Sequence, residues 1–382
     1  MRALLVAILT VILVNQAGAQ EVDLRAALKV PKITVRHSEA LPFRIAIALN
    51  DSAAAISSKP PYSAIVMIVE KDGRITVPAI HQSATATMMV LDHKQVRGLV
   101  AYGLSRVVTN NLFPSFVISE NDKKAQPFFV PTQPAALDAH ELISPTRRGN
   151  AFLYYVPREY DDGVKLIEVG IKEFSTDGDL LWEWTSSRAR KFNAEKAKAN
   201  FHDYLHVNSI SEFDKYIVIS VRDTSEVWLI DRDRKEIAHS IGLADGWTFK
   251  DDPRNGFRYQ HHAHIDAGGV LTLFDNSGSH DAPFTVEGSR AVRYRISLAA
   301  KSATLLESIP IYGAVKQRSR QGSATFLGNG YRLIGWGVAE PASCQGVSEQ
   351  PLVYSVYRDG EVIAEMQADC GWYSYRALPI FD

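Results

Sequence analysis

Paired β-type segments recur along most of this chain, and they restrict the fold more than any other feature of the sequence. Examples are SAIVMIVEKDGRITVPAI (63–80), LIEVGIKEFSTDGDLLWEW (166–184) and PLVYSVYRDGEVIAEMQ (351–367). Each reads as a strand, a polar turn such as Asp359-Gly360, and a second strand. Short loops with residues that tolerate positive φ favour β-hairpins. The sequence therefore predicts an all-β protein built largely from hairpins.

A second unit alternates with the hairpins: a polar strand, a turn with Gly or Asp, and an apolar strand. RYQHHAHIDAGGVLTLFDNS (258–277) and RQGSATFLGNGYRLIGWG (320–337) are examples. Repeats of a few tens of residues are typical of β-propeller blades, whose faces are buried by stacking. We predict a six-bladed β-propeller as a single domain over 20–382, with one inserted helix near 186–200, where a Ser cap precedes Ala, Lys and Glu. A β-sandwich is the alternative, but it does not explain the two-part unit.

The first residues predict export. One cation, Arg2, precedes an apolar run over 3–14, and Ala17-Gly18-Ala19 follows, which is the pattern of a secretory signal peptide over 1–19. The apolar run is shorter than the roughly 20 residues of a spanning helix, so we expect no membrane attachment after cleavage and a periplasmic or secreted protein. The two cysteines, Cys344 and Cys370, are then expected to form a disulfide in an oxidising compartment.

Composition excludes several classes of protein. The chain has 382 residues, a net charge of −1 and 46% hydrophobic residues. It is therefore neither disordered nor basic enough for a polyanion, and no nucleic-acid partner is predicted. The sequence gives no indication of the oligomeric state.

Histidines gather in one part of the chain. Eight of the eleven lie between His140 and His280. On a strand, alternate residues share a face, which places His206 and Asn208 together, and Arg222 follows after a turn that lets the next strand return beside them. The fork of an arginine suits a tetrahedral oxyanion such as sulfate or phosphate.

The segment QHHAH (260–264) has three imidazoles that cannot all face one way. Alternation puts His262 and His264 on the face of Gln260, and His261 on the other. Two chemistries fit: a metal site built from imidazoles, or a nucleophilic imidazole with Arg222 stabilising charge. The arginine favours an anion over a dication.

Taken in order, the motifs resemble those of a known family. DAHELISPTRRGNAFLYY, DYLHVNSI, QHHAHI, LTLFDNSGS and GSATFLGNGYRLIGWG, within 138–377, resemble the arylsulfotransferase-like proteins, which include bacterial arylsulfate sulfotransferases; residues 20–135 match poorly. The resemblance implies a six-bladed propeller and an exported enzyme. It also implies transfer of a sulfuryl group from an aryl sulfate to a phenol through a sulfohistidine, without a nucleotide donor or other cofactor.

By motif, His261 corresponds to the nucleophile of that family. The surrounding anion-stabilising and proton-transferring groups correspond to His140, His206, Asn208 and Arg222. Two alternatives stay open. One is a non-catalytic propeller that binds an anionic ligand or a protein, and the other is a metal-dependent hydrolase with His262 and His264 among its ligands.

Overall fold

The computed structural model describes most of the chain in separate ranges. They are residues 20–22, 31–51, 62–83, 88–96, 99–106, 112–118, 125–128, 138, 140–141, 143–159, 165–186, 205–278, 287–339 and 344–382. The predicted signal peptide lies outside these ranges, and the predicted helix over 186–200 does too, apart from Ser186. Across the described ranges, regular structure is β-strand except for one short 3-10 helix, which confirms the all-β prediction.

Contacts between Cα atoms divide the chain into two compact units. Unit 1 contains residues 1–129, 286–288 and 311–382, and unit 2 contains residues 130–285 and 289–310. Each unit is described by itself below. The expectation of a single domain over 20–382 stays a prediction.

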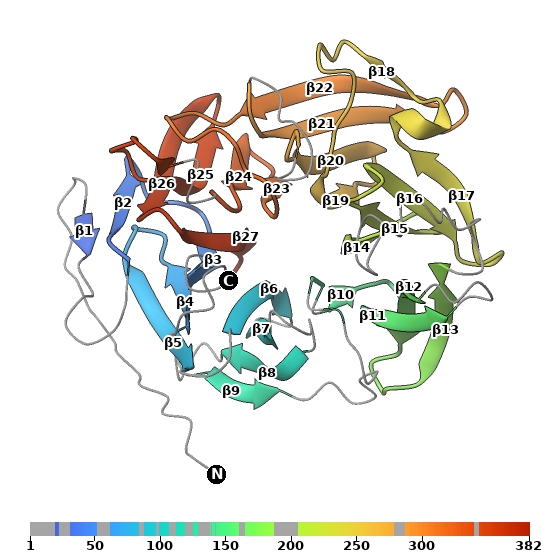
Figure 1. Cartoon of the computed structure of the whole chain (residues 1–382), viewed down its shortest axis with the longest axis horizontal. Helices are drawn as coiled ribbons and strands as arrows, with labels where there is room; N and C mark the ends of the chain where they lie inside the picture. Colours follow the sequence, from blue (N-terminus) through green and yellow to red (C-terminus); the bar gives the residue numbers. More distant parts are fainter. Residues whose placement is uncertain are drawn as a thin grey trace. The chain divides into compact units, whose positions relative to one another are not determined.

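The described strands of unit 1 form three sheets (Figure 1). Their strand orders are β1-β2-β26-β25-β24-β23, β27-β3-β4-β5 and β6-β7-β8-β9. The strands are β1 (Gln20–Val22), β2 (Ile33–His37), β3 (Arg44–Asp51), β4 (Tyr62–Val69), β5 (Ile75–Ser83), β6 (Met88–Val96), β7 (Leu99–Arg106), β8 (Leu112–Ile118), β9 (Ala125–Phe128), β23 (Ser323–Phe326), β24 (Tyr331–Gly335), β25 (Leu352–Arg358), β26 (Glu361–Ala368) and β27 (Trp372–Ile380).

The strands that the structure describes in unit 2 also form three sheets. Their strand orders are β10-β11-β12-β13, β14-β15-β16-β17 and β18-β22-β21-β20-β19. The elements are β10 (Ser144–Pro145), β11 (Asn150–Glu159), β12 (Lys165–Phe174), β13 (Leu180–Thr185), β14 (Val207–Phe213), β15 (Tyr216–Val221), β16 (Glu226–Asp231), β17 (Glu236–Ile241), the 3-10 helix η2 (Leu243–Asp245), β18 (Thr248–Lys250), β19 (His261–Ile265), β20 (Val270–Asp275), β21 (Arg290–Ser297) and β22 (Ser302–Pro310).

The hairpin between β25 and β26 shows how local sequence sets the strand pairing. Arg358 pairs with Glu361, so the loop consists of Asp359 and Gly360 alone. Both have positive φ, 51° and 92°, which is the requirement of a type I′ turn and the reason that Asp-Gly favours it. The predicted hairpin is confirmed at this turn.

The stacking of sheets in unit 2 explains why β15 and β16 read as unbroken apolar runs. Every residue of both strands is buried. On β15, Ile217 and Ile219 belong to a core shared with the β10–β13 sheet, whereas Val218 belongs to a core shared with the β18–β22 sheet. The middle sheet is thus covered on both faces, as a blade between two others is, and the propeller-like class is confirmed.

The two ends of the chain meet in the sheets of unit 1. The last strand, β27, pairs with β3 from Ile380 opposite Arg44 to Trp372 opposite Asp51. Near the start, β2 pairs with β26 (Figure 1). Strands more than 300 positions apart in the sequence therefore complete the same sheets.

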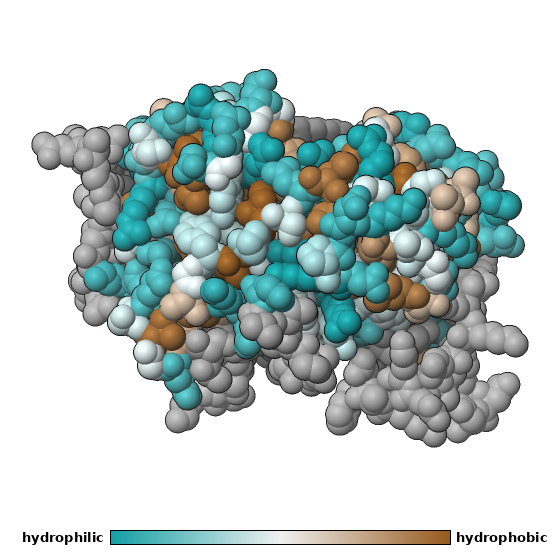
Figure 2. Space-filling model, turned by 90° about the horizontal axis from the view of Figure 1, so that it is seen from above, coloured by the Kyte–Doolittle hydropathy of each residue, from teal (hydrophilic) through white to brown (hydrophobic). Residues whose placement is uncertain are grey.

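The predicted disulfide is present in unit 1: Cys344 is bonded to Cys370. In the part of the chain that the structure describes, no helix has the length and apolar character needed to cross a membrane. On the surface seen in Figure 2, hydrophilic residues are interspersed with small hydrophobic groups. Such a mixture is ordinary for a folded protein.

Candidate functional site

The five predicted site residues all lie in unit 2, beside or at the ends of its strands. His140 precedes β10, His206 immediately precedes β14, and Asn208 is the second residue of β14. Arg222 follows β15, and His261 is the first residue of β19. The hairpin of β14 and β15 pairs Val207 with Val221. Its turn brings the Arg222 backbone N–H to the His206 carbonyl, 3.3 Å away. The return of the chain that the spacing predicts is therefore present.

Asn208 connects this hairpin to the strand of the histidine cluster. Its side chain is fully buried, and its Nδ2 donates to the backbone carbonyl of Gln260 over 2.8 Å. Gln260 is buried as well, and its Nε2 donates to the carbonyls of Val221 and Glu226 at 3.1 and 2.8 Å. These bonds fix the residue before His261 against β15 and β16.

His261 is enclosed in the protein, with only 2% of its surface exposed. Its Nδ1 lies 2.8 Å from Oδ1 of Asn276, which is also buried. An amide oxygen only accepts hydrogen bonds, so the pairing places the proton of a neutral His261 on Nδ1. The lone pair of the imidazole is then on Nε2.

The other two imidazoles of the cluster, those of His262 and His264, are more exposed than that of His261. Both are half-buried, and their ring centroids are 5.3 Å apart. His261 pairs with Phe274 and His264 with Thr272. Residues two apart on β20 share a face, so the predicted separation of His264 from His261 is wrong. His262 has φ 55° where the pairing with β20 shifts its register, a β-bulge.

The placement of Gln260 on the face of His262 and His264 is wrong. Gln260 is buried, and β19 begins only at His261. Tyr259 has φ 52°, so the extended alternation does not run through this part of the chain.

The surroundings of His261 favour its uncharged form. Burial lowers its pKa well below the usual 6.5, and the nearby charge of Arg222 lowers it further. His206 and His140 act in the same direction, whereas the hydrogen bond with Asn276 acts in the opposite one. The imidazole is therefore neutral, and hence nucleophilic, near pH 7.

His140 has a different kind of partner. Its Nδ1 lies 2.6 Å from Oδ1 of Asp138, and the same oxygen accepts the backbone N–H of His140 at 3.0 Å. Both side chains are buried. The ring of His206 stands edge-on to that of His140, with 4.8 Å between the centroids. The carboxylate of Asp138 therefore fixes the orientation of the His140 ring through Nδ1.

Arg222 supplies the positive charge of the site. It is 7% exposed, its Nη1 donates to Asp223 over 2.5 Å, and its guanidinium lies over the ring of Tyr259, 5.4 Å from the centroid. Its Nε is buried without a hydrogen-bond partner among the described residues. A buried N–H of this kind suits an anionic ligand, since leaving it unsatisfied costs about 1–3 kcal/mol.

Asp138 and Asn276 were not predicted as site residues. Both lie in motifs that carried the resemblance, DAHELI and LTLFDNSGS. An acidic residue two positions before a histidine is the local signal for Asp138, because the side chain reaches back over a short turn. Asn276 has no such signal, since its contact with His261 spans 15 positions.

The metal alternative has little support in the side chains. The residues that the structure describes include no group of three or more His, Cys, Asp or Glu arranged to hold a metal ion. The positive charge of Arg222 also acts on His261, which disfavours a cation there.

Comparison with known proteins gives one informative match. The model of a family described as Arylsulfotransferase (ASST) matches residues 167–343, a segment that contains the site residues from His206 to Asn276. A search of curated proteins finds no match to the chain.

Two solved structures match over most of their length at very low identity. One is a protein from Lactobacillus plantarum, 9% identical, covering 92% of this chain and 86% of that chain with a TM-score of 0.35. The other is a β-xylosidase/α-arabinofuranosidase from a compost microbial metagenome, 8% identical, covering 92% and 89% with a TM-score of 0.28. Neither likeness says anything about the function of this chain.

Proposed function

The match over residues 167–343 supports an arylsulfotransferase-like family and function for this chain, and on that premise we propose that it transfers a sulfuryl group from an aryl sulfate ester to a phenolic acceptor. The transfer proceeds through a sulfated His261. No nucleotide donor takes part.

The observation that carries the proposal is the pairing of a neutral, buried imidazole with a buried guanidinium. His261 has its proton on Nδ1 and its lone pair on Nε2, and the charge of Arg222 acts on the same ring. An aryl sulfate is a monoanion with an electrophilic sulfur, so it needs both a nucleophile and a fixed positive charge.

In the first half-reaction, Nε2 of His261 forms a bond to sulfur while the bond between sulfur and the phenolic oxygen breaks. Arg222 and Asn208 hold the non-bridging oxygens. His140 or His206 gives a proton to the departing phenolate. Such transfers require mainly positioning and charge stabilisation from the protein.

In the second half-reaction, the acceptor phenol returns its proton to the same histidine, and its oxygen attacks sulfur. The bond between sulfur and Nε2 breaks, and His261 is restored. Donor and acceptor use one site in turn, so ping-pong kinetics are expected.

Export is part of the proposal. The pattern of residues 1–19 predicts it, and the disulfide of Cys344 and Cys370 is compatible with an oxidising compartment. We expect the substrates to be small phenols and their sulfate esters outside the cytoplasm.

A chromogenic aryl sulfate tests the reaction directly. Rapid mixing should release one equivalent of phenol in a burst, leaving an acid-labile sulfate on His261 that mass spectrometry locates. His261→Ala should abolish both. Turnover by His261→Ala at the wild-type rate would exclude the mechanism.

A non-catalytic anion-binding role is the second candidate, since the buried Nε of Arg222 favours an anion whether or not chemistry follows. It predicts that an aryl sulfate raises the melting temperature of the protein with no release of phenol. The burst experiment separates the two roles.

A further inference from the structure

Two histidines of the site have chemically different partners at the same ring atom. Nδ1 of His261 meets the neutral amide oxygen of Asn276 at 2.8 Å. Nδ1 of His140 meets the carboxylate of Asp138 at 2.6 Å. Both partners are buried, so neither contact is screened by water as a surface contact would be.

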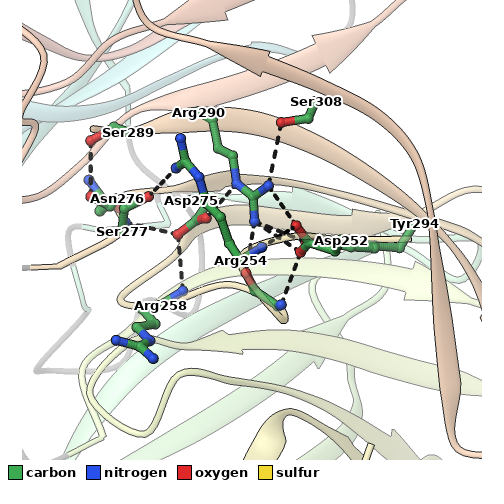
Figure 3. A network of polar contacts seen from close by, with 11 residues as sticks. Asp252, Arg254, Arg258, Asp275, Asn276, Ser277, Ser289, Arg290, Tyr294 and Ser308 are labelled. Carbon is green, nitrogen blue, oxygen red and sulfur yellow. Dashed lines mark hydrogen bonds and ion pairs between the residues drawn. The ribbon is translucent and has the colours of Figure 1, made fainter. Parts of the chain in front are cut away.

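The position of Asn276 is fixed by a polar network beyond the site (Figure 3). Its backbone carbonyl accepts the hydroxyl of Ser289 at 2.9 Å. On one side Asp275 accepts the Nε of Arg290, and on the other the backbone N–H of Ser277 donates to Asp275 at 2.8 Å. The backbone of Asn276, directly after β20, is therefore held on both sides, and this places its side chain next to His261.

The arginine of that network is itself held on two sides. Arg290 donates to both carboxylate oxygens of Asp252, at 2.9 and 3.0 Å, and Asp252 also accepts the hydroxyl of Tyr294 at 2.6 Å (Figure 3). Figure 3 shows Asn276 and Ser277 at one end of the network and Tyr294 at the other. The network thus reaches from the core of the sheet to the partner of His261.

An amide and a carboxylate do different things to an imidazole. An amide oxygen holds the Nδ1 proton and adds no negative charge, which leaves a neutral ring with its lone pair on Nε2. A carboxylate stabilises the ring with both nitrogens protonated, which can then give a proton from Nε2. The same contrast of environments separates acid from base in many enzymes.

We infer that Asn276 and Asp138 are positioning residues that give the two histidines different roles. Asn276 holds His261 as the neutral nucleophile. Asp138 makes His140 the proton donor to the departing phenolate. The inference rests on the proposed function and deepens it, because the sequence left His140 and His206 as equal candidates for the donor.

The steps balance with these roles. Attack by Nε2 of neutral His261 gives a positively charged ring that carries the transferred sulfuryl group. The proton on Nδ1 of His261 stays hydrogen-bonded to Asn276. The phenolate takes a proton from Nε2 of His140, and His140 becomes neutral. The proton on Nδ1 of His140 stays hydrogen-bonded to Asp138. The acceptor phenol later returns that proton as its oxygen bonds to sulfur and the sulfur–nitrogen bond breaks.

A neutral partner also serves the second half-reaction. A carboxylate in place of Asn276 would stabilise the positively charged sulfohistidine and slow its breakdown. Asn276→Asp should therefore keep or lengthen the life of the intermediate while slowing turnover. Loss of structure alone would lower the amount of intermediate instead.

The first arm of the test is NMR of the purified protein labelled with [15N]histidine, with His261→Gln used to identify the His261 signals. Wild-type His261 should show the neutral tautomer with the proton on Nδ1 near pH 7. Asn276→Asp should shift the ring toward the doubly protonated form, against the positive charges of Arg222, His206 and His140. Ser308→Ala, which removes a contact of 3.4 Å at the far side of Arg290, is the matched control and should behave as wild type.

The second arm compares a poor leaving group with a good one. Asp138→Asn keeps an oxygen for the backbone N–H of His140 but removes the charge. It should slow the turnover of phenyl sulfate by about 100-fold and that of 4-nitrophenyl sulfate by less than about 10-fold. General acid catalysis raises a rate by a factor of about 10²–10⁴, and a good leaving group needs little of it.

Each arm has an outcome that overturns the inference. A wild-type His261 with its proton on Nε2, or an Asn276→Asp protein with the wild-type His261 signal, would refute the role of Asn276 even if no turnover were found. Equal slowing of both sulfates by Asp138→Asn would refute the role of Asp138. An absence of any burst, with the expected tautomer in place, would instead refute the proposed function.

Discussion

Replacing Arg290 by methionine should destabilise unit 2 by several kcal/mol. Arg290 is 1% exposed, and it forms ion pairs with Asp252 and Asp275, each at 2.9 Å. Removing one partner of a buried pair leaves an uncompensated charge, which costs about 3–5 kcal/mol. Methionine fills most of the volume, so a cavity contributes little. The loss approaches the whole stability of a typical domain, roughly 5–15 kcal/mol.

The destabilisation should depend on pH in a defined direction. Burial alone would raise the pKa of Asp252, but hydrogen bonds from Arg290 and Tyr294 outweigh it and lower that pKa from 3.8 to about 2. The folded carboxylate thus contributes stability above about pH 4 that is lost as the pH falls toward 2. Since a difference of one pKa unit is worth about 1.36 kcal/mol, this contribution is about 2 kcal/mol.

Without Arg290, burial raises the pKa of Asp252 above its value in the unfolded chain. The variant then loses stability as the pH rises, whereas the wild type does not. The gap between the free energies of unfolding of the two proteins should be widest near neutral pH and should narrow as the pH falls toward 4. This contribution overlaps with the cost of breaking the pair, so the two magnitudes are not added.

Urea unfolding at two pH values, followed by tryptophan fluorescence, measures the gap. Arg293→Met is the matched control, since Arg293 lies on the same strand but is partly exposed and its ion pairs are 3.9 Å long. Its effect should stay below about 1 kcal/mol. Wild-type midpoints for Arg290→Met, or a gap of the same size at both pH values, would refute the reasoning.

Three further outcomes are expected. Replacing Cys344 and Cys370 by serine should lower the free energy of unfolding by about 3 kcal/mol, as for a closed loop of 26 positions; urea midpoints that reductant does not change would contradict this. Arg222→Lys should reduce kcat/KM for an aryl sulfate about 10- to 100-fold, because lysine lacks the planar fork; Arg234→Lys, at an exposed ion pair, is its control, and equal rates would argue against oxyanion binding. Since the pKa of His261 lies well below 6.5, kcat/KM for 4-nitrophenyl sulfate should stay level as the pH falls from about 7.5 to 6; a decline centred near 6.5 would show that His261 titrates normally.

Local features of the fold could be predicted from the sequence, because they depend on neighbouring residues. The turn at Asp359 and Gly360 needs two positive φ values, and Asp-Gly supplies them. The apolar run from Tyr216 to Val221 indicates a strand buried on both faces. The pairing of β27 with β3 could not be predicted in the same way, since no local pattern selects a partner more than 300 positions away.

The site follows the same division. The spacing predicted that the hairpin returns Arg222 beside His206, which the backbone hydrogen bond between them confirms. Alternation could not predict the faces of His261 and His264, because a β-bulge between them shifts the register. Asn276 became a site residue only through the contact of its amide with His261, between the residue after β20 and the first residue of β19. The roles of these site residues in the reaction stay predictions.

The pairing of β27 with β3 also sets the order in which the protein can be completed. During synthesis β3 emerges more than 300 residues before Trp372, the first residue of its partner strand. Until then one edge of the β3–β5 sheet has no neighbour and can pair with another chain. Pairing with β27 removes this exposed edge, and it becomes possible only after Trp372 and the residues that follow it have been made.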